Sequence, residues 1–263
     1  MLKSLSIVSV NKNNFNGLVK TLKSLQEIKN IFSFDHIIVD GKSSDLRIDL
    51  SDLKFQYNFE FISENDSGIY EAMNKGIRLS NNGRLLFLNS GDTISDYTKF
   101  EQFIHYNSEY DLVYSNVLKV NEDNSLIHSK FPSILTLDYM ICYGLPHQAT
   151  IISKNLFDKV GLYNEHYKII SDWVFFMESL FFHNASYKHV DLEPICFDGT
   201  GISNQNSYLK LIIKEQLHYI SKRFPEKTFL YKTGSPYVKK YFRQMPRWKK
   251  PLKKYLFLKY NHI

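Results

Sequence analysis

The 263-residue chain has little cysteine and no long apolar run. Its two cysteines, Cys142 and Cys196, show neither metal-ligand spacing nor a disulfide framework, which suits a reducing compartment. No stretch approaches the roughly 18 uninterrupted apolar residues of a membrane span. The apolar segment near the start is too short for a secretory signal. We therefore expect the folded body to be cytoplasmic.

Two nucleotide-binding signatures are also missing. The glycine-rich stretch FDGTGIS, residues 197–203, lacks the lysine pattern of a P-loop, and no G-x-G-x-x-G opens a helix. Nucleotide hydrolysis and dinucleotide binding therefore have no motif support. We interpret FDGTGIS as a flexible linker ahead of a boundary near residues 203–207.

Acidic residues are scarce in the last part of the chain. Residues 207–263 hold fifteen Lys or Arg against Glu215 and Glu226, a local +13, so a net charge of +6 leaves −7 for the other 206 residues. A nucleic-acid-binding protein would carry positive charge on its folded body, which argues against that class. Residues 235–263 mix Lys and Arg with aromatic and leucine side chains. This mixture predicts a tail that binds an anionic membrane surface, and a solvated terminus is the alternative.

The apolar pattern alternates between strand and helix periods. Strands are expected at 5–10, 36–39, 59–63 and 84–88, and helices at 17–25 and 69–80. Because these strands are too apolar to have a solvated face, they predict an α/β fold with a mostly parallel sheet covered by helices on both sides. The second half is less regular, with strands expected at 110–120 and 148–153 and helices at 134–144, 154–161 and 172–183.

Polar residues follow several of the expected strands, at the sheet edge where α/β proteins bind ligands. Ser9 and Asn11 end the first strand, Asp40 ends the second, and Asn89 to Asp92 follow the fourth. Asp92 is either a turn or helix-cap residue or a ligand of a divalent cation, which prefers carboxylate oxygen. Asp40 is either a turn residue or an acceptor for a base or ribose.

Three further residues have both a structural and a functional interpretation. Asp66, or its neighbour Ser67, can cap the helix that starts near residue 69, and capping is compatible with ligand contact. Asp172 opens an apolar helix, where a carboxylate either complements the helix dipole or serves as a general base, with Ser171 sharing the capping. His147 precedes a strand and is either a buried structural histidine or a residue that holds an acceptor or phosphate.

The ordered set of motifs resembles a known family. SIVSVNKNN, IIVDGKSSD, SENDSGIYEAMNKGI, LLFLNSGD, PHQATI, SDWVFF and GIS follow one another over about residues 4–203. Together they resemble the family 2 glycosyltransferases, in particular bacterial members that assemble surface polysaccharides such as O-antigen, capsule or exopolysaccharide. The combination of DSGIYEAMNKG with LNSGD is specific, although each short motif alone is weak.

The resemblance implies a GT-A fold over residues 1–206, with a nucleotide-binding half at 1–95 and an acceptor-binding half at 96–206. Residues 207–263 would form a basic, partly helical extension. The implied activity is inverting transfer of a hexosyl or N-acetylhexosaminyl group from a nucleotide-sugar, most simply a UDP-sugar, to a glycan or polyprenyl-linked acceptor. The implied roles are base and ribose contacts for Ser9, Asn11 and Asp40, nucleotide or donor contacts for Asp66, Asn89, Ser90 and Gly91, Mg²⁺ or Mn²⁺ binding for Asp92, catalytic base for Asp172, and acceptor contacts for His147 and Trp173.

Two positions depart from the family pattern. Asn89 stands where the metal-binding D-x-D motif has its first aspartate, and Ser171 precedes Asp172 where many members have an acidic pair. These departures leave open an inactive nucleotide-sugar-binding protein of the same fold. A nucleic-acid-binding protein acting through the basic tail is a weaker alternative.

Overall fold

The computed structural model describes residues 5–29, 32–45, 55, 57–106, 109–121, 123, 125–199, 201 and 206–244. The chain forms two compact units. The first combines Met1–Ile134 with Leu145–Thr200, and the second combines Leu135–Gly144 with Gly201–Ile263. By these contacts, residues 135–144 belong with the C-terminal helices, although they precede the predicted boundary near residue 206.

Within the described residues, the first unit is built around a nine-stranded sheet with the order β3-β2-β1-β4-β8-β6-β9-β5, and β7 pairs with β6. Its first half is parallel and its second half is mixed, because β8 runs antiparallel to both β4 and β6. The elements are β1 (Leu5–Asn11), α1 (Phe15–Ile28), β2 (Phe34–Asp40), β3 (Glu60–Ser63), α2 (Ile69–Leu79), β4 (Arg84–Phe87), β5 (Thr93–Ile94), α3 (Tyr97–His105), β6 (Leu112–Val120), β7 (Leu126–Ser129), the 3₁₀ helix η3 (His147–Ala149), β8 (Thr150–Ser153), α5 (Lys154–Val160), α6 (Ser171–Phe181) and β9 (Tyr187–Asp198).

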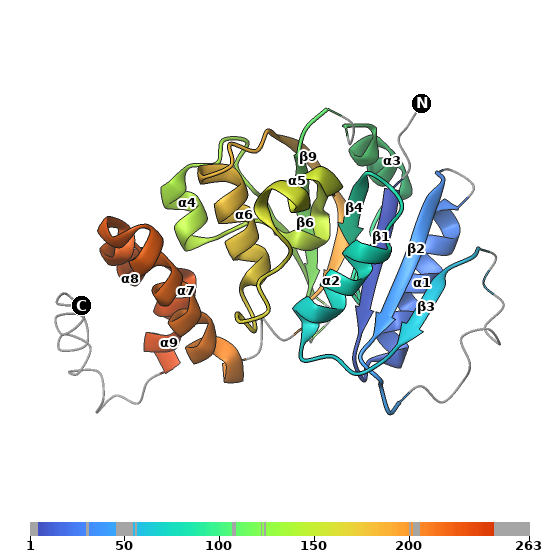
Figure 1. The fold of residues 1–263 in the computed structure, drawn as a ribbon, viewed down its shortest axis with the longest axis horizontal. Helices are drawn as coiled ribbons and strands as arrows, with labels where there is room; N and C mark the ends of the chain where they lie inside the picture. Colours follow the sequence, from blue (N-terminus) through green and yellow to red (C-terminus); the bar gives the residue numbers. More distant parts are fainter. Residues whose placement is uncertain are drawn as a thin grey trace. The chain divides into compact units, whose positions relative to one another are not determined.

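Helices α1 and α2 cover opposite faces of the first half of the sheet (Figure 1). Successive strand residues point to opposite faces, and Ile7 of β1 belongs to the same buried cluster as Leu25 of α1. The next residue, Val8, lies against Gly76 of α2, where an added Cβ would come within 2.3 Å of Val8 Cγ1. The predicted α/β fold, with a mostly parallel sheet flanked by helices, is therefore confirmed.

Three strands were not predicted. β5 and β7 are short, and the pattern of β9 is interrupted by Pro194 and by charged residues between its apolar ones. β9 nevertheless pairs in parallel with β6 along most of its length, with an irregularity between Ser115 and Val117. It ends at Asp198, so Phe197 and Asp198 belong to a strand. The linker interpretation of FDGTGIS was wrong for these two residues, and residues 202–205 lie outside the described part.

The second unit consists of helices. They are α4 (Leu137–Cys142), the 3₁₀ helix η5 (Asn206–Tyr208), α7 (Leu209–Arg223), the 3₁₀ helix η6 (Pro225–Lys227), α8 (Thr228–Gly234) and α9 (Pro236–Gln244). The helix expected within 134–144 is thus confirmed as α4. Tyr231 donates a 2.6 Å hydrogen bond to Gln216 Oε1, and Lys227 Nζ lies 2.6 Å from Asp138 Oδ1. The tail after residue 244 lies outside the described residues.

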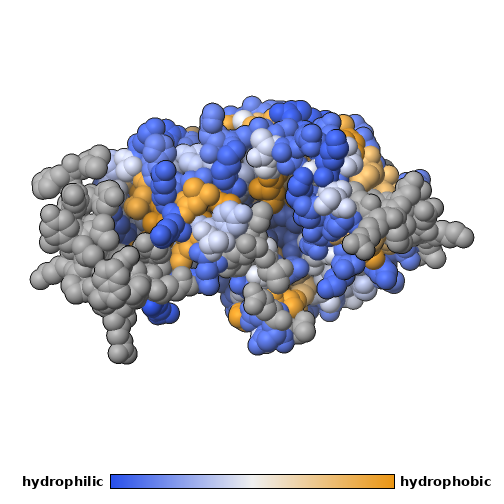
Figure 2. Space-filling view, turned by 90° about the horizontal axis from the view of Figure 1, so that it is seen from below, coloured by the Kyte–Doolittle hydropathy of each residue, from blue (hydrophilic) through white to orange (hydrophobic). Residues whose placement is uncertain are grey.

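One face of the molecule is mainly polar. The face seen in Figure 2 is mostly hydrophilic, with hydrophobic colour in several separate areas. None of the helices in the described part of the chain is long and apolar enough to span a membrane.

Candidate functional site

The parallel register of the first three strands gathers polar side chains at their carboxyl ends. Asn11 pairs with Asp40, and Asp40 pairs with Ser63. Asp40 Oδ1 accepts a 2.7 Å hydrogen bond from Asn11 Nδ2, and Oδ2 accepts bonds from Ser63 Oγ at 2.7 Å and from the Ser43 backbone N–H at 2.9 Å. Burial favours the neutral carboxyl, but these bonds outweigh it and lower the pKa of Asp40. The strand ends therefore hold an ionised carboxylate, but Asp40 is fully buried and bonded to protein groups, so its predicted base or ribose contact stays a prediction.

Ser9 also lies near this edge, but its hydroxyl faces the interior. It is fully buried and donates a 2.6 Å hydrogen bond to the Leu88 carbonyl oxygen. Nε2 of the buried His36 lies 2.9 Å from the same hydroxyl. Because protein groups already engage the Ser9 side chain, this arrangement lends no support to its predicted ligand contact.

Asp66 lies beside the second strand end and does not cap a helix. α2 begins after Gly68 without a side-chain cap, so the capping interpretation of Asp66 and Ser67 was wrong. An added Cβ on Gly41 would come 2.4 Å from Asp66 Oδ2 and 3.0 Å from Lys12 Cδ. Burial raises the pKa of Asp66, while the charges of Lys12 and Lys75 oppose the shift. The Asp66 carboxyl group is thus close in space to Gly41, the residue that follows Asp40 at the end of β2.

The loop after β4 turns sharply at Asn89 to Asp92. Ser90 N–H donates to the Val10 carbonyl oxygen at 3.2 Å, and Gly91 has a positive φ of 108°. The helix-cap interpretation of Asp92 was wrong, because Asp96 caps α3 by accepting a hydrogen bond from the Lys99 N–H. The loop instead keeps the Asp92 carboxyl at the sheet edge.

Asp92 is almost completely buried, with 3% of its surface exposed. Its Oδ1 accepts a 3.0 Å hydrogen bond from the Asp198 N–H, and its Oδ2 accepts a 3.2 Å bond from the Asn89 N–H. Burial raises the pKa of Asp92 to about 7, and the negative charge of Asp198 adds to this shift. A carboxyl group in this position needs either a proton or a cation.

Asp198 is a site residue that sequence reasoning missed. It ends β9, and its Oδ2 lies 2.6 Å from the position that a Cβ on Gly91 would take. Glycine at position 91 therefore allows the second carboxylate to approach the loop. The available signal was an aspartate followed by glycine within FDGTGIS, which we interpreted as a linker.

Asp172 lies in the first turn of α6 and receives hydrogen bonds on both oxygens. The Tyr70 hydroxyl lies 2.7 Å from Oδ1 and also 2.7 Å from the Ile169 carbonyl oxygen. His147 Nδ1 lies 2.9 Å from Oδ2. Burial alone would raise the pKa of Asp172, but the interactions with His147 and Tyr70 outweigh it and lower the pKa. Since 18% of its side chain remains exposed, Asp172 is an ionised carboxylate that a ligand can reach.

Tyr70 was not predicted as a site residue, although its helix was. Burial, together with the negative charge of Asp172, raises the pKa of Tyr70 well above its ordinary value. The hydroxyl therefore remains a donor over the physiological pH range. Its signal in the sequence is no stronger than that of any other aromatic residue on an apolar helix face.

His147 joins the two sides of the site. Its Nδ1 faces Asp172, and its Nε2 lies 3.1 Å from the amide nitrogen Nδ2 of Asn89. The predicted base, the predicted acceptor histidine and the loop with the predicted metal ligand are thus connected by one imidazole ring. The sequence placed these residues up to 83 positions apart, and the fold brings them together.

The neighbours of Asp172 differ in their access to ligands. Trp173 is 7% exposed, so little of its side chain is free for the predicted acceptor contact. Ser171 does not cap α6, because the N-cap is Ile170 and no side chain bonds there. Ser171 Oγ is buried without a hydrogen-bond partner among the described residues. The idea that Ser171 shares the capping was therefore wrong.

The carboxylates at the loop fit a divalent cation that is completed by other ligands. No group of three or more His, Cys, Asp or Glu side chains in the described ranges is placed to hold a metal ion. Asp92 and Asp198 nevertheless supply two carboxylates, and the missing side chain of Gly91 lets the Asp198 carboxylate approach the loop. Mg²⁺ is commonly bound in this way, by one or two carboxylates together with substrate phosphates and water.

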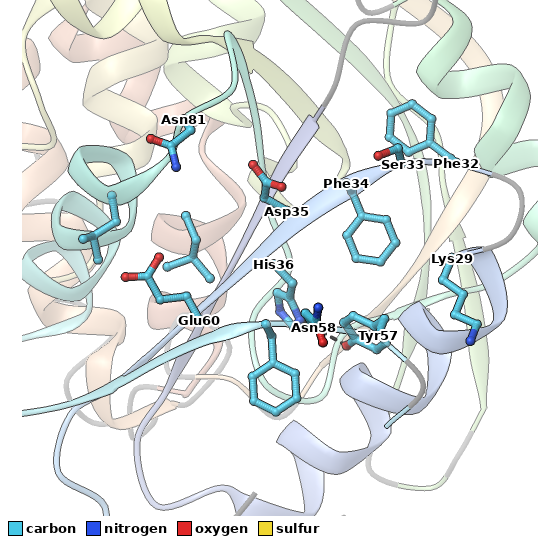
Figure 3. A pocket seen from close by; sticks show the side chains of 13 residues that line it. Lys29, Phe32, Ser33, Phe34, Asp35, His36, Tyr57, Asn58, Glu60 and Asn81 are labelled. Carbon is cyan, nitrogen blue, oxygen red and sulfur yellow. Dashed lines mark hydrogen bonds between the residues drawn. The ribbon is translucent and has the colours of Figure 1, made fainter. Parts of the chain in front are cut away.

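A cavity of about 550 Å³ lies elsewhere in the first unit (Figure 3). Its lining includes Phe34 and Glu60, the first residues of β2 and β3, together with Tyr57. The candidate site is instead formed at the opposite, carboxyl ends of these strands, at Asp40 and Ser63. The cavity is therefore separate from the residues described above.

The chain is similar in sequence to known glycosyltransferases. Residues 6–179 match the family model described as Glycosyl transferase family 2. The chain is similar to a PGL/p-HBAD biosynthesis glycosyltransferase of Mycobacterium bovis, with 28% identity over 149 residues, 54% of this chain and 56% of the relative. It is also similar to an uncharacterized glycosyltransferase of Mycobacterium tuberculosis, with 27% identity over 67% of this chain and 68% of the relative. The match to the first relative thus spans little more than half of that protein.

Solved structures of S. aureus TarS share the fold. The complex of TarS 1–349 with UDP-GlcNAc has a TM-score of 0.66 at 14% identity, over 94% of this chain and 78% of that one. The complex with UDP has a TM-score of 0.62 at 15% identity, over 95% and 78%. The predicted GT-A fold is confirmed by this likeness.

Proposed function

Because the chain belongs to glycosyl transferase family 2, we propose that it transfers a sugar from a nucleotide-sugar donor to an acceptor hydroxyl with inversion at the anomeric carbon. The observation that carries the proposal is the position of Asp172. It is an ionised, reachable carboxylate that His147 connects to the Asn89–Asp92 loop. A base and a diphosphate-binding loop would thus lie on either side of the reacting sugar.

Asp172 acts as the general base in this proposal. Each carboxylate oxygen has two lone-pair positions, so the bonds to Tyr70 and His147 leave room for an acceptor hydroxyl. The hydroxyl proton passes to Asp172 as the acceptor oxygen forms a bond to the anomeric carbon. The bond from that carbon to the phosphate oxygen breaks, and the nucleoside diphosphate leaves.

The other strand ends bind the donor. In this proposal the base or ribose lies at the strand ends formed by Asn11 and Asp40. Asp66 lies toward the donor, and the diphosphate lies at Ser90 and Gly91. Asp92 and Asp198 would hold Mg²⁺ or Mn²⁺, which when bound offsets the charge of the departing diphosphate. The net charge of −7 outside the C-terminal region makes this help useful, since that part offers an anionic donor little attraction.

The donor is a UDP-sugar in this proposal, with a hexose or N-acetylhexosamine as the transferred group. The TarS complexes with UDP and UDP-GlcNAc support this choice, because they share the fold. The acceptor is a glycan or a polyprenyl-linked saccharide in surface polysaccharide synthesis. The mycobacterial relative is named as a glycosyltransferase of PGL and p-HBAD biosynthesis, which supports a biosynthetic role.

A thermal-shift experiment tests the donor class. UDP, GDP, CDP and dTDP are each added to the full chain with Mn²⁺ and, separately, with EDTA. A ligand that binds only the native state raises the unfolding temperature. At a concentration of 100 times its Kd, it adds about 2.7 kcal/mol to the free energy of unfolding. We expect UDP with Mn²⁺ to give the largest rise. The absence of a rise with all four nucleotides in Mn²⁺ would contradict the proposed function.

A further inference from the structure

We propose that Asn89 is a positioning residue for Asp172 and that it acts through the tautomer of His147. The proposal rests on the proposed function, since it concerns the same base. Asn89 lies on the loop after β4, His147 on η3, and Asp172 at the start of α6. Three separate segments of the chain therefore meet at one imidazole ring.

The hydrogen-bond chemistry of an amide fixes the protonation of the ring. An amide nitrogen donates hydrogen bonds but has no lone pair with which to accept one. Asn89 Nδ2 lies 3.1 Å from His147 Nε2, so Nε2 is the acceptor and carries no proton. The single proton of the neutral ring then sits on Nδ1, which donates to Asp172 Oδ2 at 2.9 Å. One amide thus determines the direction of both hydrogen bonds.

This direction matters because carboxylates surround the histidine. Asp172 of α6 lies against Nδ1, and Asp92 stands three residues after Asn89 on the loop that faces Nε2. The Asn89 amide requires a lone pair on Nε2. The amide therefore fixes which ring nitrogen presents a proton to Asp172.

A neutral histidine orients Asp172 and leaves it basic. An imidazolium would form an ion pair with the carboxylate and weaken its attraction for the acceptor proton. A neutral N–H gives the carboxylate a fixed orientation without a full opposing charge. Tyr70 does the same at Oδ1, since its raised pKa keeps its hydroxyl neutral. Asn89 thereby positions Asp172 through the opposite nitrogen of the His147 ring.

The asparagine at position 89 thus supplies a hydrogen-bond donor that an aspartate would lack. An aspartate there would present only acceptor atoms, so Nε2 would have to carry a proton. With Nδ1 still donating to Asp172, the ring would become an imidazolium. The departure from the D-x-D pattern therefore has a chemical consequence at Asp172, which lies on another element.

Nitrogen NMR of the full chain tests this inference. Long-range ¹H–¹⁵N spectra of the labelled protein at pH 7.5 report which ring nitrogens of each histidine carry a proton. His147 is assigned by the signal that disappears in His147→Asn. We expect a protonated Nδ1 and an unprotonated Nε2 in the unaltered protein, and two protonated nitrogens in Asn89→Asp.

The matched control is Asn82→Asp. Asn82 Nδ2 donates to Asp35 Oδ2 at 2.7 Å on the surface, so this variant makes the same chemical change outside the site. It should leave the His147 pattern unaltered. A protonated Nε2 in the unaltered protein, including a doubly protonated ring with the amide reversed, overturns the proposal. A folded Asn89→Asp variant in which the protonation pattern of His147 is unchanged also overturns the proposal. If that variant does not fold, the spectrum of the unaltered protein alone tests the proposal.

Transfer assays supply a second readout. The side-chain amide of His147→Asn places an N–H near the position of Nδ1, whereas that of His147→Gln places it near Nε2. We expect kcat of His147→Asn to be about tenfold higher than that of His147→Gln, with a similar KM for a UDP-sugar. General acid–base catalysis commonly contributes at least this much to the rate. Equal losses would contradict the proposal. UDP binding by the same samples tests the proposed function separately, because the tautomer does not depend on it.

Discussion

At the scale of single residues, two buried carboxyl groups of the site are stabilised in opposite ways. Asp172 receives hydrogen bonds from Tyr70 and His147, which lower its pKa despite burial. Asp92 receives two backbone N–H bonds, but burial still raises its pKa to about 7. The first group is thus held ionised, and the second keeps its proton up to about pH 7.

Substitution of Asp172 by Asn should remove transfer and leave nucleotide binding intact. The amide cannot take the acceptor proton, so kcat should fall by about 10²–10⁴-fold. UDP affinity, measured by calorimetry in Mn²⁺, should change little because Asp172 bonds to Tyr70 and His147 and not to the strand-end residues. A variant that keeps full kcat would show that another group is the base. Loss of UDP affinity instead would place Asp172 in the donor site.

The stability of the metal-free protein should fall as pH rises through Asp92 ionisation. In the unfolded chain this carboxyl ionises near pH 3.8, and in the folded protein near pH 7. Between these values the unfolded state has lost the proton and the folded state has kept it, so the free energy of unfolding decreases with pH. The free energy of unfolding should fall by about 1–4 kcal/mol in total by pH 8, because each unit of difference between the folded and unfolded pKa corresponds to about 1.4 kcal/mol.

Urea unfolding at pH 5 and pH 8 in EDTA measures this loss. Asp92→Asn removes the titrating group, so its free energy of unfolding should depend less on pH in this window. Saturating Mn²⁺ should restore stability to the unaltered protein at pH 8. An identical pH dependence in the two proteins would show that Asp92 does not titrate as described.

At the scale of the elements, strand register gathers the site and glycine lets its parts approach. The pairing of β1 with β2 and of β2 with β3 puts Asn11, Asp40 and Ser63 side by side. The loop after β4 meets the end of β9 at Gly91. Regular pairing thus forms the proposed nucleotide side of the site, and an irregular loop forms its proposed diphosphate side.

Two glycines with similar backbone angles make a matched pair of variants. Gly91 and Gly161 have φ of 108° and 99°, but an added Cβ would come 2.6 Å from Asp198 Oδ2 at position 91 and would meet nothing within 4 Å at position 161. Both changes to Ala should cost about 1–2 kcal/mol of stability through backbone strain. Only Gly91→Ala should also weaken Mn²⁺-dependent UDP binding, as measured by calorimetry. Equal affinities in the two variants would separate Asp198 from the ligand site.

Gly76 provides a test of how α2 packs on the sheet. Alanine usually favours a helix over glycine by about 1 kcal/mol, but here its Cβ would lie 2.3 Å from Val8 Cγ1. We expect Gly76→Ala to destabilise the protein by about 1–3 kcal/mol, because overpacking outweighs propensity. Chemical denaturation measures the change. The double variant with Val8→Ala should recover part of the loss, and a stabilised Gly76→Ala would refute the close contact.

The sequence predicted the elements whose signals are local. Strand β1 and helix α1 have clear apolar periods, and Asp40 and Asp92 follow buried strands, so these features were found. Strand β9 was not predicted, because its pattern of polar and apolar residues depends on its pairing with β6, which is distant in the chain. Tyr70, Asp198 and the bridge formed by His147 depend on tertiary contacts. No local pattern of residue types specifies such contacts.

At the scale of the whole chain, charge is divided along the sequence. Residues 1–206 carry −7 and residues 207–263 carry +13. Residues 245–263 contain six Lys or Arg and no Asp or Glu. We propose that residues 245–263, the part of the predicted tail after α9, hold the enzyme at an anionic membrane surface, where a polyprenyl-linked acceptor would be available.

A chain ending at Gln244 tests this proposal and keeps α9. Each Lys or Arg near such a surface contributes about 1 kcal/mol. The shortened chain should therefore bind vesicles containing phosphatidylglycerol at least about tenfold more weakly in a co-sedimentation assay. Neutral phosphatidylcholine vesicles and high salt are the controls, because both remove the electrostatic attraction. Equal binding of the two chains to anionic vesicles would exclude the tail as the anchor.

The hydrogen bond from the Asp198 N–H to Asp92 also bears on the order of folding. It joins residues 106 positions apart, and in the strand order of the sheet β8 and β6 lie between β4 and β9. The parallel strands β1 to β4 involve nearer neighbours in sequence and should close earlier, since distant contacts cost more chain entropy to form. During synthesis, a ribosome would have to release residue 198 before the loop gained its last backbone donor. Affinity for the nucleotide should therefore arise late, as one of the final steps of maturation.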